Sequence, residues 1–156
     1  MIKVLTSDYA YHVLSRLVSV SSSVDILSYV VNFNLNKRSD KANLIFTALK
    51  RLSAARIPIR IVLDSPRLHR SNYHCNKFST RRFKEAGFSV RFLHSGDTQH
   101  AKLFLLDRAT AITGSHNLTS RSVLNLTYIS LLLDDPPLVQ YFCSFFDHVW
   151  STSQEV

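Results

Sequence analysis

Short apolar runs typical of buried strands alternate along this chain with longer segments whose apolar residues recur at helical spacing. The patterns predict helices over residues 8–20, 41–56, 71–86 and from 134 onward, and strands over residues 24–31, 59–63, 88–93, 101–106, 109–113 and 126–133. Strands that alternate with helices usually form one sheet between helical layers, so we expect an α/β fold with a mixed β-sheet flanked by helices on both faces. The sheet is expected to be mixed because Asp107 and Arg108 join two successive strands tightly, as in a hairpin.

The length and composition fit a single domain over residues 1–156. Of the 156 residues, 46% are hydrophobic, which is enough to bury a core and excludes disorder for most of the chain. We expect the final helix to bury six apolar residues: Leu138, Tyr141, Phe142, Phe145, Phe146 and Val149. No segment has the pattern of a targeting peptide or a membrane span, and two cysteines cannot form a disulfide framework. We therefore expect a cytoplasmic protein in a reducing compartment, without a membrane partner.

The positive charge is concentrated in the middle third of the chain. The formal net charge is +8, from 19 basic and 11 acidic residues. Residues 37–91 hold fourteen basic and three acidic residues, a net charge of +11, whereas residues 1–36 are neutral and residues 92–156 carry −3. A compact domain of this charge is expected to bind a polyanion, such as a nucleic acid or an anionic membrane.

Aromatic residues are interleaved with these cations. Residues 71–88 contain Tyr73, Phe78, Phe83 and Phe88 among several lysines and arginines. This mixture suits a phosphate backbone with stacked bases, although an amphipathic helix more often buries such rings in the core. The residues that we expect to contact substrate through their charge are Lys37, Arg38, Arg81 and Arg82.

One stretch near the end of the chain gathers the side chains that phosphoryl transfer needs. Residues 99–118 read QHAKLFLLDRATAITGSHNL. His100 and Lys102 lie two apart, so on a strand both side chains point to one face. A hairpin returns Ser115 and Asn117 toward the same level. The imidazole can act as nucleophile or general acid near neutral pH, and the ammonium can stabilise phosphate oxygens.

Two further residues complete the pattern. Gly114 is expected to let the backbone approach a phosphate closely, and Asp107 to orient a cation or a loop. Together the six residues resemble the phospholipase D superfamily signature, H-x-K-x4-D-x6-G-S-x-N, with its spacing kept. The resemblance implies a phospholipase D-like domain that needs no metal or cofactor and whose catalytic residues are His100, Lys102, Asp107, Ser115 and Asn117.

The signature occurs once, which limits the kind of member that the chain resembles. Single-motif members include small endonucleases that pair two chains about a two-fold axis. By that resemblance, His100 of each protomer would meet its copy at one shared site in a homodimer. One imidazole would form a phosphohistidine, and the other would protonate the leaving oxygen and then activate water.

The chain departs from the family pattern after the signature. Family nucleases often carry an acid near the start of the next strand that orients the nucleophilic histidine, but this chain has Asn125, Leu126 and Thr127 there. Asn125 or Thr127 is expected to hold the imidazole by a neutral hydrogen bond, which supports an imidazolium less well. His116, a variable position of the motif, is expected at the rim of the site or against substrate.

Other titratable residues carry weaker signals. His94 lies in a loop just before the site and is expected to be an exposed loop histidine or to touch substrate. His69, His74 and Cys75 are three potential ligands without a matching partner cluster, so we expect no metal site.

Three functions remain open. The first is a metal-independent, dimeric endonuclease for DNA or RNA with little sequence specificity, favoured by the single motif, the small size and the cationic middle third. The second is a nucleic-acid-binding module with weak or no catalysis, favoured only by the missing acid. The third is a phospholipid phosphodiesterase. The sequence has no membrane anchor and no apolar helix surface beyond what the core needs, which argues against this third function.

Overall fold

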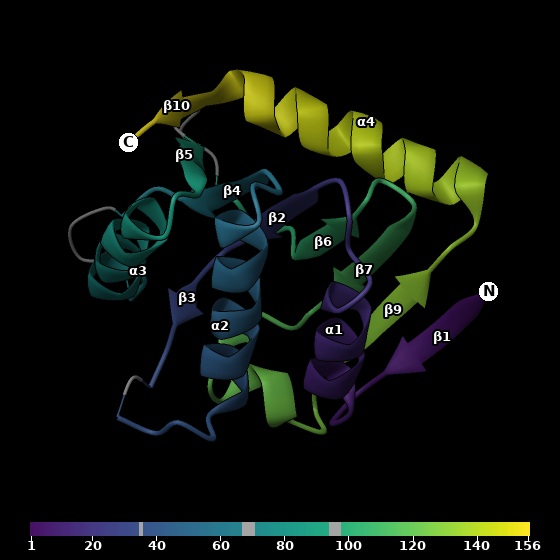
Figure 1. Cartoon of the computed structure of the whole chain (residues 1–156), viewed down its shortest axis with the longest axis horizontal. Helices are drawn as coiled ribbons and strands as arrows, with labels where there is room; N and C mark the ends of the chain where they lie inside the picture. Colours follow the sequence, from purple (N-terminus) through teal and green to yellow (C-terminus); the bar gives the residue numbers. More distant parts are fainter. Residues whose placement is uncertain (35, 67–70, 94–97) are drawn as a thin grey trace.

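The computed structural model describes residues 1–34, 36–66, 71–93 and 98–156. Within them the main feature is an eight-stranded sheet in the order β1-β9-β7-β6-β2-β4-β5-β10 (Figure 1). Its strands are β1 (Ile2–Leu5), β2 (Val24–Ser28), β4 (Ile59–Asp64), β5 (Ser89–Leu93), β6 (Leu103–Leu106), β7 (Thr110–Gly114), β9 (Ser130–Leu133) and β10 (Ser153–Glu155). The helices are α1 (Tyr9–Leu17), α2 (Lys41–Ala54), α3 (Tyr73–Glu85) and α4 (Pro136–Thr152). Two short strands, β3 (Val31–Asn32) and β8 (Leu118–Thr119), form a separate parallel pair.

The sheet changes from parallel to antiparallel pairing at β2. This strand pairs in parallel with β4, which in turn pairs in parallel with β5. On its other side β2 pairs antiparallel with β6, and the antiparallel pairing continues through β7 and β9 to β1. The predicted mixed sheet is thereby confirmed. As a result, the carboxyl ends of β2 and β4 lie beside the start of β6, and such strand ends are where ligand sites in α/β sheets usually form.

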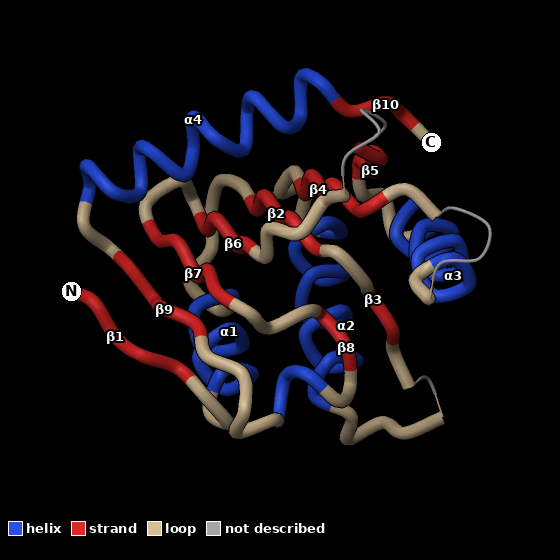
Figure 2. The backbone as a smooth tube through the Cα atoms, turned by 180° about the vertical axis from the view of Figure 1, so that it is seen from behind, coloured by secondary structure: helices blue, strands red, loops and turns tan. Residues whose placement is uncertain are grey.

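Helices cover both faces of the sheet, as the sequence predicts. On one face α1, α2 and α3 pack against the strands around buried side chains that include Leu17, Ile45 and Phe83. Of the described helices, α4 alone lies across the other face (Figure 2).

The prediction for the buried stripe of α4 is wrong in part. Leu138, Tyr141 and Phe145 are exposed by 43, 69 and 39%. Apolar residues occupy more of the circumference of α4 than one sheet face can cover, so helical spacing alone does not identify the stripe that packs. The helix therefore presents an apolar outer surface that the core does not use. Its buried residues are Val139, Cys143, Phe146 and Val149.

The strands that the sequence patterns miss are short, and they lie at the sheet edges or in the separate pair: β1, β10, β3 and β8. Residues 126–129, expected in the last strand, precede β9 instead. The side-chain oxygen of Asn125 accepts bonds from the N–H and the hydroxyl of Thr127, each at 2.9 Å. Such a local bond favours a turn over an extended strand.

The turn between β6 and β7 is built by Asp107 and Arg108. Their φ angles are +53° and +54°, which is the pattern of a type I′ hairpin turn. The Asp107 carboxylate accepts the N–H groups of Ser21, Ser22 and Ser23 at 3.0, 2.7 and 3.0 Å. The hairpin is thereby attached to the loop between α1 and β2.

We predict that Asp107→Ala lowers the free energy of unfolding at pH 7 by about 2 kcal/mol or more, because charge-assisted hydrogen bonds and tolerance of positive φ are both lost. Burial opposes ionisation of Asp107, but the N–H groups of Ser22, Ser23 and Ser21 outweigh it and hold its pKa below the ordinary value. A carboxyl with a depressed pKa stabilises the fold above its unfolded-state pKa, and the contribution disappears as the pH falls through the folded-state value.

Urea unfolding at pH 7 and at pH 3 checks this prediction. The stability difference between native protein and Asp107→Asn, which keeps the tolerance of positive φ, should be smaller at pH 3. An equal difference at the two pH values would show that the charge of Asp107 does not hold the loop.

Candidate active site

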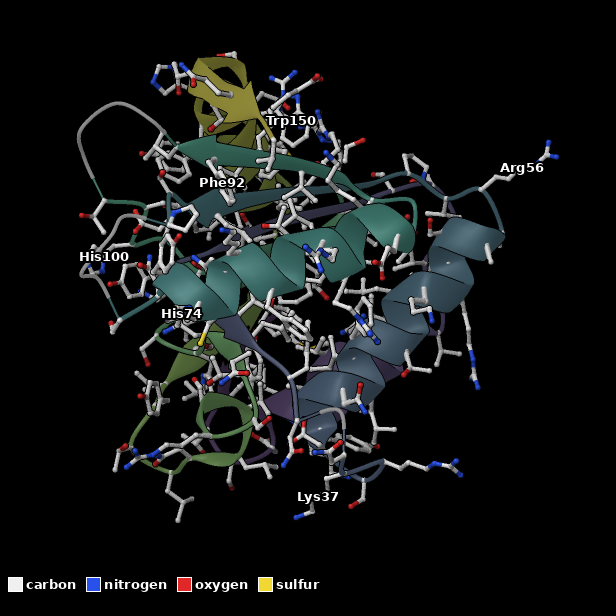
Figure 3. The ribbon with its side chains drawn as sticks, turned by 90° about the vertical axis from the view of Figure 1, so that its left-hand side faces the viewer. Lys37, Arg56, His74, Phe92, His100 and Trp150 are labelled. Atoms are coloured by element: carbon white, nitrogen blue, oxygen red, sulfur yellow. The ribbon has the colours of Figure 1, made fainter. Side chains whose placement is uncertain are left out.

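His100 lies at the carboxyl ends of β2 and β4, in the segment that leads into β6. Its ring stacks on that of Tyr29, with centroids 4.9 Å apart and planes 5° from parallel. Tyr29 directly follows β2, and the antiparallel pairing of β2 with β6 brings the two residues together. Because β6 begins at Leu103, His100 precedes the strand on which the sequence analysis placed it. Figure 3 shows His100 at the end of the molecule where α3 begins.

Lys102 adds a positive charge beside this ring. Its ammonium donates to the carbonyl oxygen of His100 and lies 5.7 Å from the centre of the Tyr29 ring. The hydroxyl of Thr113 donates to the carbonyl oxygen of Lys102 at 2.9 Å, which fixes the backbone from the side of β7. Burial lowers the pKa of Lys102 below the usual lysine value. The His100 imidazole and the Lys102 ammonium therefore both lie against the ring of Tyr29.

The end of β7 approaches this pair through Gly114, whose N–H donates to the carbonyl oxygen of Lys102 at 3.3 Å. A Cβ atom at position 114 would lie 2.4 Å from both the Ile129 carbonyl oxygen and the Ser130 Cα. Glycine is thus required where β7 packs against β9. The approach of Gly114 to a phosphate, expected from the sequence, stays a prediction.

Ser115 and Asn117 are each held by a neighbouring main chain. The Ser115 hydroxyl accepts the N–H of Ile129 at 2.9 Å and donates to its carbonyl oxygen at 3.1 Å. The side-chain oxygen of Asn117 accepts the N–H of Val30, the residue after Tyr29, at 3.4 Å. The donor that Asn117 offers to a phosphate is therefore its NH2 group. These contacts bring four of the predicted catalytic residues to one end of the sheet: His100, Lys102, Ser115 and Asn117.

A buried carboxylate supports the segment that carries His100. Asp64, fully buried at the end of β4, accepts the N–H of Gln99 at 2.8 Å. It also accepts the side-chain amide of Asn72, the residue before α3, at 2.6 Å. One carboxylate thus joins the residue before His100 to the beginning of α3.

Asn76 supports Tyr29, whose ring stacks on that of His100. Its side-chain NH2 donates to the carbonyl oxygens of Tyr29 and Asp64 at 2.9 and 3.0 Å, and its oxygen accepts the N–H of Val31 at 3.0 Å. Buried polar groups that are fully bonded favour one arrangement of the backbone. Neither Tyr29 nor these polar residues were expected at the site from the sequence. The available signal was a stripe of polar residues at helical spacing where α3 is buried: Asn72, Asn76 and Ser79.

Asp107 does not belong to this cluster. It directly follows β6, about 16 Å of extended chain away from Lys102, and binds the serine loop described above. Of the two roles expected for it, orienting a cation or a loop, the structure has the second. Its assignment to the catalytic set is therefore corrected.

His116 is also misassigned. It is buried, stacks on Tyr9 with centroids 4.2 Å apart, and its Nδ1 lies 2.8 Å from the Ser130 hydroxyl oxygen. Successive residues of an extended segment point to opposite sides, so residue 116 faces the core while its two neighbours face the site. Burial lowers the pKa of His116, which favours the neutral ring.

The expected substitutes for the missing acid do not reach the imidazole. Asn125 and Thr127 bond to each other, and within the described residues no hydrogen bond joins either side chain to His100. The contact that orients the imidazole is the stack on Tyr29.

The predicted cationic contacts lie on several surfaces. Lys37 and Arg38 are exposed in the loop before α2, and Figure 3 shows Lys37 far from His100. Arg81 is exposed on α3, whereas Arg82 is half-buried near Lys50 of α2. Their contact with substrate stays a prediction.

His94 and His69 lie outside the described residues. Cys75 is half-buried and His74 exposed in the first turn of α3. Across residues 1–34, 36–66, 71–93 and 98–156, no group of three or more His, Cys, Asp or Glu side chains is arranged to hold a metal ion. In the same part of the chain, no helix has the length and apolar character needed to cross a membrane.

Known proteins share this fold. Nuc from Salmonella typhimurium, a phospholipase D family member, superposes with a TM-score of 0.77 at 18% identity, covering 100% of this chain and 97% of Nuc. NucT from Helicobacter pylori gives 0.75 at 17% identity, covering 100% and 98%. The archaeal chromatin protein TrmBL2 gives 0.63 at 14% identity, covering 99% of this chain and 54% of that protein.

Sequence comparison gives the family. A mitochondrial cardiolipin hydrolase from Chlamydomonas reinhardtii is 28% identical over 94 residues, which span 60% of this chain and 40% of that relative. The family model described as cardiolipin synthase, PLD-like domain, matches residues 13–150. The chain therefore belongs to this family of phospholipase D-like domains, within the phospholipase D superfamily of phosphodiesterases.

Proposed function

We propose that this chain is a metal-independent endonuclease that hydrolyses DNA or RNA through a phosphohistidine on His100, with little sequence specificity. One observation carries the proposal, namely an imidazole and an ammonium fixed on the same side chain, Tyr29. An oriented nucleophile and a preset positive charge are what displacement at phosphorus needs. Ser115 and Asn117 add hydrogen-bonding groups from the segment between β7 and β8.

The reaction takes two displacements. A lone pair of a His100 ring nitrogen attacks phosphorus, a P–N bond forms, and the P–O bond to the leaving strand breaks while that oxygen takes a proton from a second imidazole. Water then attacks phosphorus, gives a proton to the second imidazole, and the P–N bond breaks to restore His100. The net reaction consumes one water and leaves a phosphate monoester and a free hydroxyl.

The second imidazole is proposed to be His100 of the partner subunit. The signature occurs once in this sequence, so one chain supplies one such imidazole. A two-fold axis through the site would place two identical histidines on either side of one phosphate. The proposed enzyme is therefore a homodimer with a shared active site.

A nucleic acid is favoured as substrate by charge. The net charge of +11 over residues 37–91 suits a polyanion whose binding depends on phosphates. The similarity to TrmBL2, whose structure is described as showing a novel mode of DNA binding, agrees with this choice at the level of fold.

We predict that native protein cleaves labelled single-stranded DNA, duplex DNA or RNA in excess EDTA, and that His100→Asn lowers the rate by about a thousand-fold or more because the nucleophile is lost. His148→Asn, at an exposed position of α4, is the matched control and should retain activity. If native protein and His100→Asn cut nothing yet retard the nucleic acid equally, the chain is a binding module.

A shared site predicts a non-linear loss of activity in mixed dimers. After subunit exchange with three parts of His100→Asn, about one dimer in sixteen has two native chains. Activity should therefore fall well below the native fraction of one in four. A fall in proportion to that fraction would assign the whole reaction to one protomer.

We predict that Tyr29 is a positioning residue for the nucleophile. Tyr29→Leu removes the stacked ring and should lower kcat at least about ten-fold with KM little changed, whereas Tyr29→Phe keeps the ring and the activity. Tyr11→Leu is the matched control, because Tyr11 contacts His12 away from the site. Equal losses in Tyr29→Phe and Tyr29→Leu would contradict a role for the stack.

A phospholipid phosphodiesterase is the second candidate, and exposed apolar residues near the site favour it. Leu124, Leu126 and Ile129 follow the signature and are 49, 74 and 56% exposed. The matching family model and the Chlamydomonas relative are also named for cardiolipin. Cleavage of lipid in cardiolipin vesicles by native protein and not by His100→Asn, with nucleic acids left intact, would replace the endonuclease by this function.

A further inference from the structure

The outer face of α3 combines cations with an uncovered aromatic ring. Lys77, Phe78 and Arg81 are exposed, and together with His74 they line one shallow depression. Phe78 keeps 48% of its surface exposed. Cations beside a partly exposed aromatic ring are the combination with which proteins bind single-stranded nucleic acid, so this face is a candidate ligand surface.

The structure separates this ring from the other aromatic residues of the cationic segment. Phe83 is fully buried under α3, and Phe88 is buried next to it. The Tyr73 ring holds the Lys77 ammonium, which lies 5.5 Å from its centre and 3.5 Å from its hydroxyl oxygen. Of the Tyr and Phe side chains on α3, Phe78 is the most exposed.

The helix that carries this face begins beside the candidate active site. Asn76 of α3 donates to the carbonyl oxygen of Tyr29, whose ring stacks on His100. Asn72 and Gln99, which directly precede α3 and His100, bind the same carboxylate. Figure 3 shows the start of α3 at the same end of the molecule as His100.

The charges on this face are open to a ligand. Within the described residues, neither Lys77 nor Arg81 forms a salt bridge. From His74 to Arg81 the helix rises about 10 Å, which matches roughly three nucleotides of a stacked strand.

We propose that the face formed by His74, Lys77, Phe78 and Arg81 binds single-stranded nucleic acid as it leaves the active site. Lys77 and Arg81 contact phosphates, and a base stacks on Phe78. The inference rests on the proposed function, which supplies the class of substrate, a nucleic acid. It adds a preference for single-stranded over duplex substrate. The bases of a duplex are stacked on one another, so a single exposed ring finds a free base face only in a single strand. One ring among cations offers little apolar area to a lipid surface.

The experiment compares two pairs of substitutions that remove the same charge. Lys77→Gln/Arg81→Gln removes two cations from this face, and Arg51→Gln/Arg56→Gln removes two exposed cations at the end of α2. Figure 3 shows Arg56 on the side of the molecule away from His100. Kd is measured by fluorescence anisotropy for labelled oligothymidine and for a duplex of equal length, at several salt concentrations. All chains carry His100→Asn so that cleavage does not interfere.

Loss of the two α3 cations should raise the Kd for oligothymidine about ten-fold and lower the slope of log Kd against log salt by about 1.4. The α2 pair should change Kd by less than about two-fold. Phe78→Ala should raise the oligothymidine Kd about ten-fold and leave the duplex Kd unchanged, whereas Phe78→Trp should retain affinity.

Equal Kd values for the α3 pair and the α2 pair would overturn the inference, as would an equal effect of Phe78→Ala on oligothymidine and duplex. Loss of binding to anionic vesicles in the α3 pair, with oligothymidine affinity intact, would assign this face to lipid instead. Cleavage in EDTA tests the proposed function separately. Absence of cleavage with α3-dependent binding rejects only the endonuclease, and cleavage without α3-dependent binding rejects only this inference.

Discussion

A buried carboxylate at the end of β4 determines where the candidate active site stands. Asp64 has no exposed surface, and leaving a buried polar group without a hydrogen-bond partner costs about 1 to 3 kcal/mol. The N–H of Gln99 and the amide of Asn72 are therefore kept in place, and with them the segment before β6 and the first turn of α3. The segment that carries His100 and the helix that flanks it are therefore held by one side chain.

A second group of charges joins the sheet to α4. It also reduces the positive charge that is free to bind a ligand. Asp25 is 1% exposed and accepts two bonds from Arg60, at 2.7 and 2.8 Å. Arg108 reaches both Asp25 and Asp147 of α4, at 3.5 and 2.6 Å. Some cations counted in the middle of the sequence, Arg60 among them, thus belong to the packing of α4. The charge available to a ligand is smaller than the sequence suggests and is concentrated on fewer surfaces.

The layers, the hairpin and the proximity of His100 and Lys102 were predictable because each depends on periodicity or spacing within a short segment. The residues that the sequence did not reveal depend on contacts between distant segments. Tyr29 meets His100 only through the pairing of β2 with β6. On α4, spacing identified an apolar helix but not the stripe that packs, since Phe145 and Phe146 have the same side chain and differ only in what covers them.

Four of the six positions of the signature fall into two physical kinds. His100 and Lys102 are exposed or half-exposed groups whose replacement would leave the packing of the sheet intact. Replacement of Gly114 or Asp107 would disturb the fold. Gly114 allows β7 to pack against β9, and Asp107 holds the turn between β6 and β7 in place. Selection for folding alone would retain glycine and aspartate at these positions in a chain that had lost all chemistry. In more distant sequences, a signature reduced to those two residues therefore records shared architecture, and evidence for catalysis has to come from the histidine and the lysine.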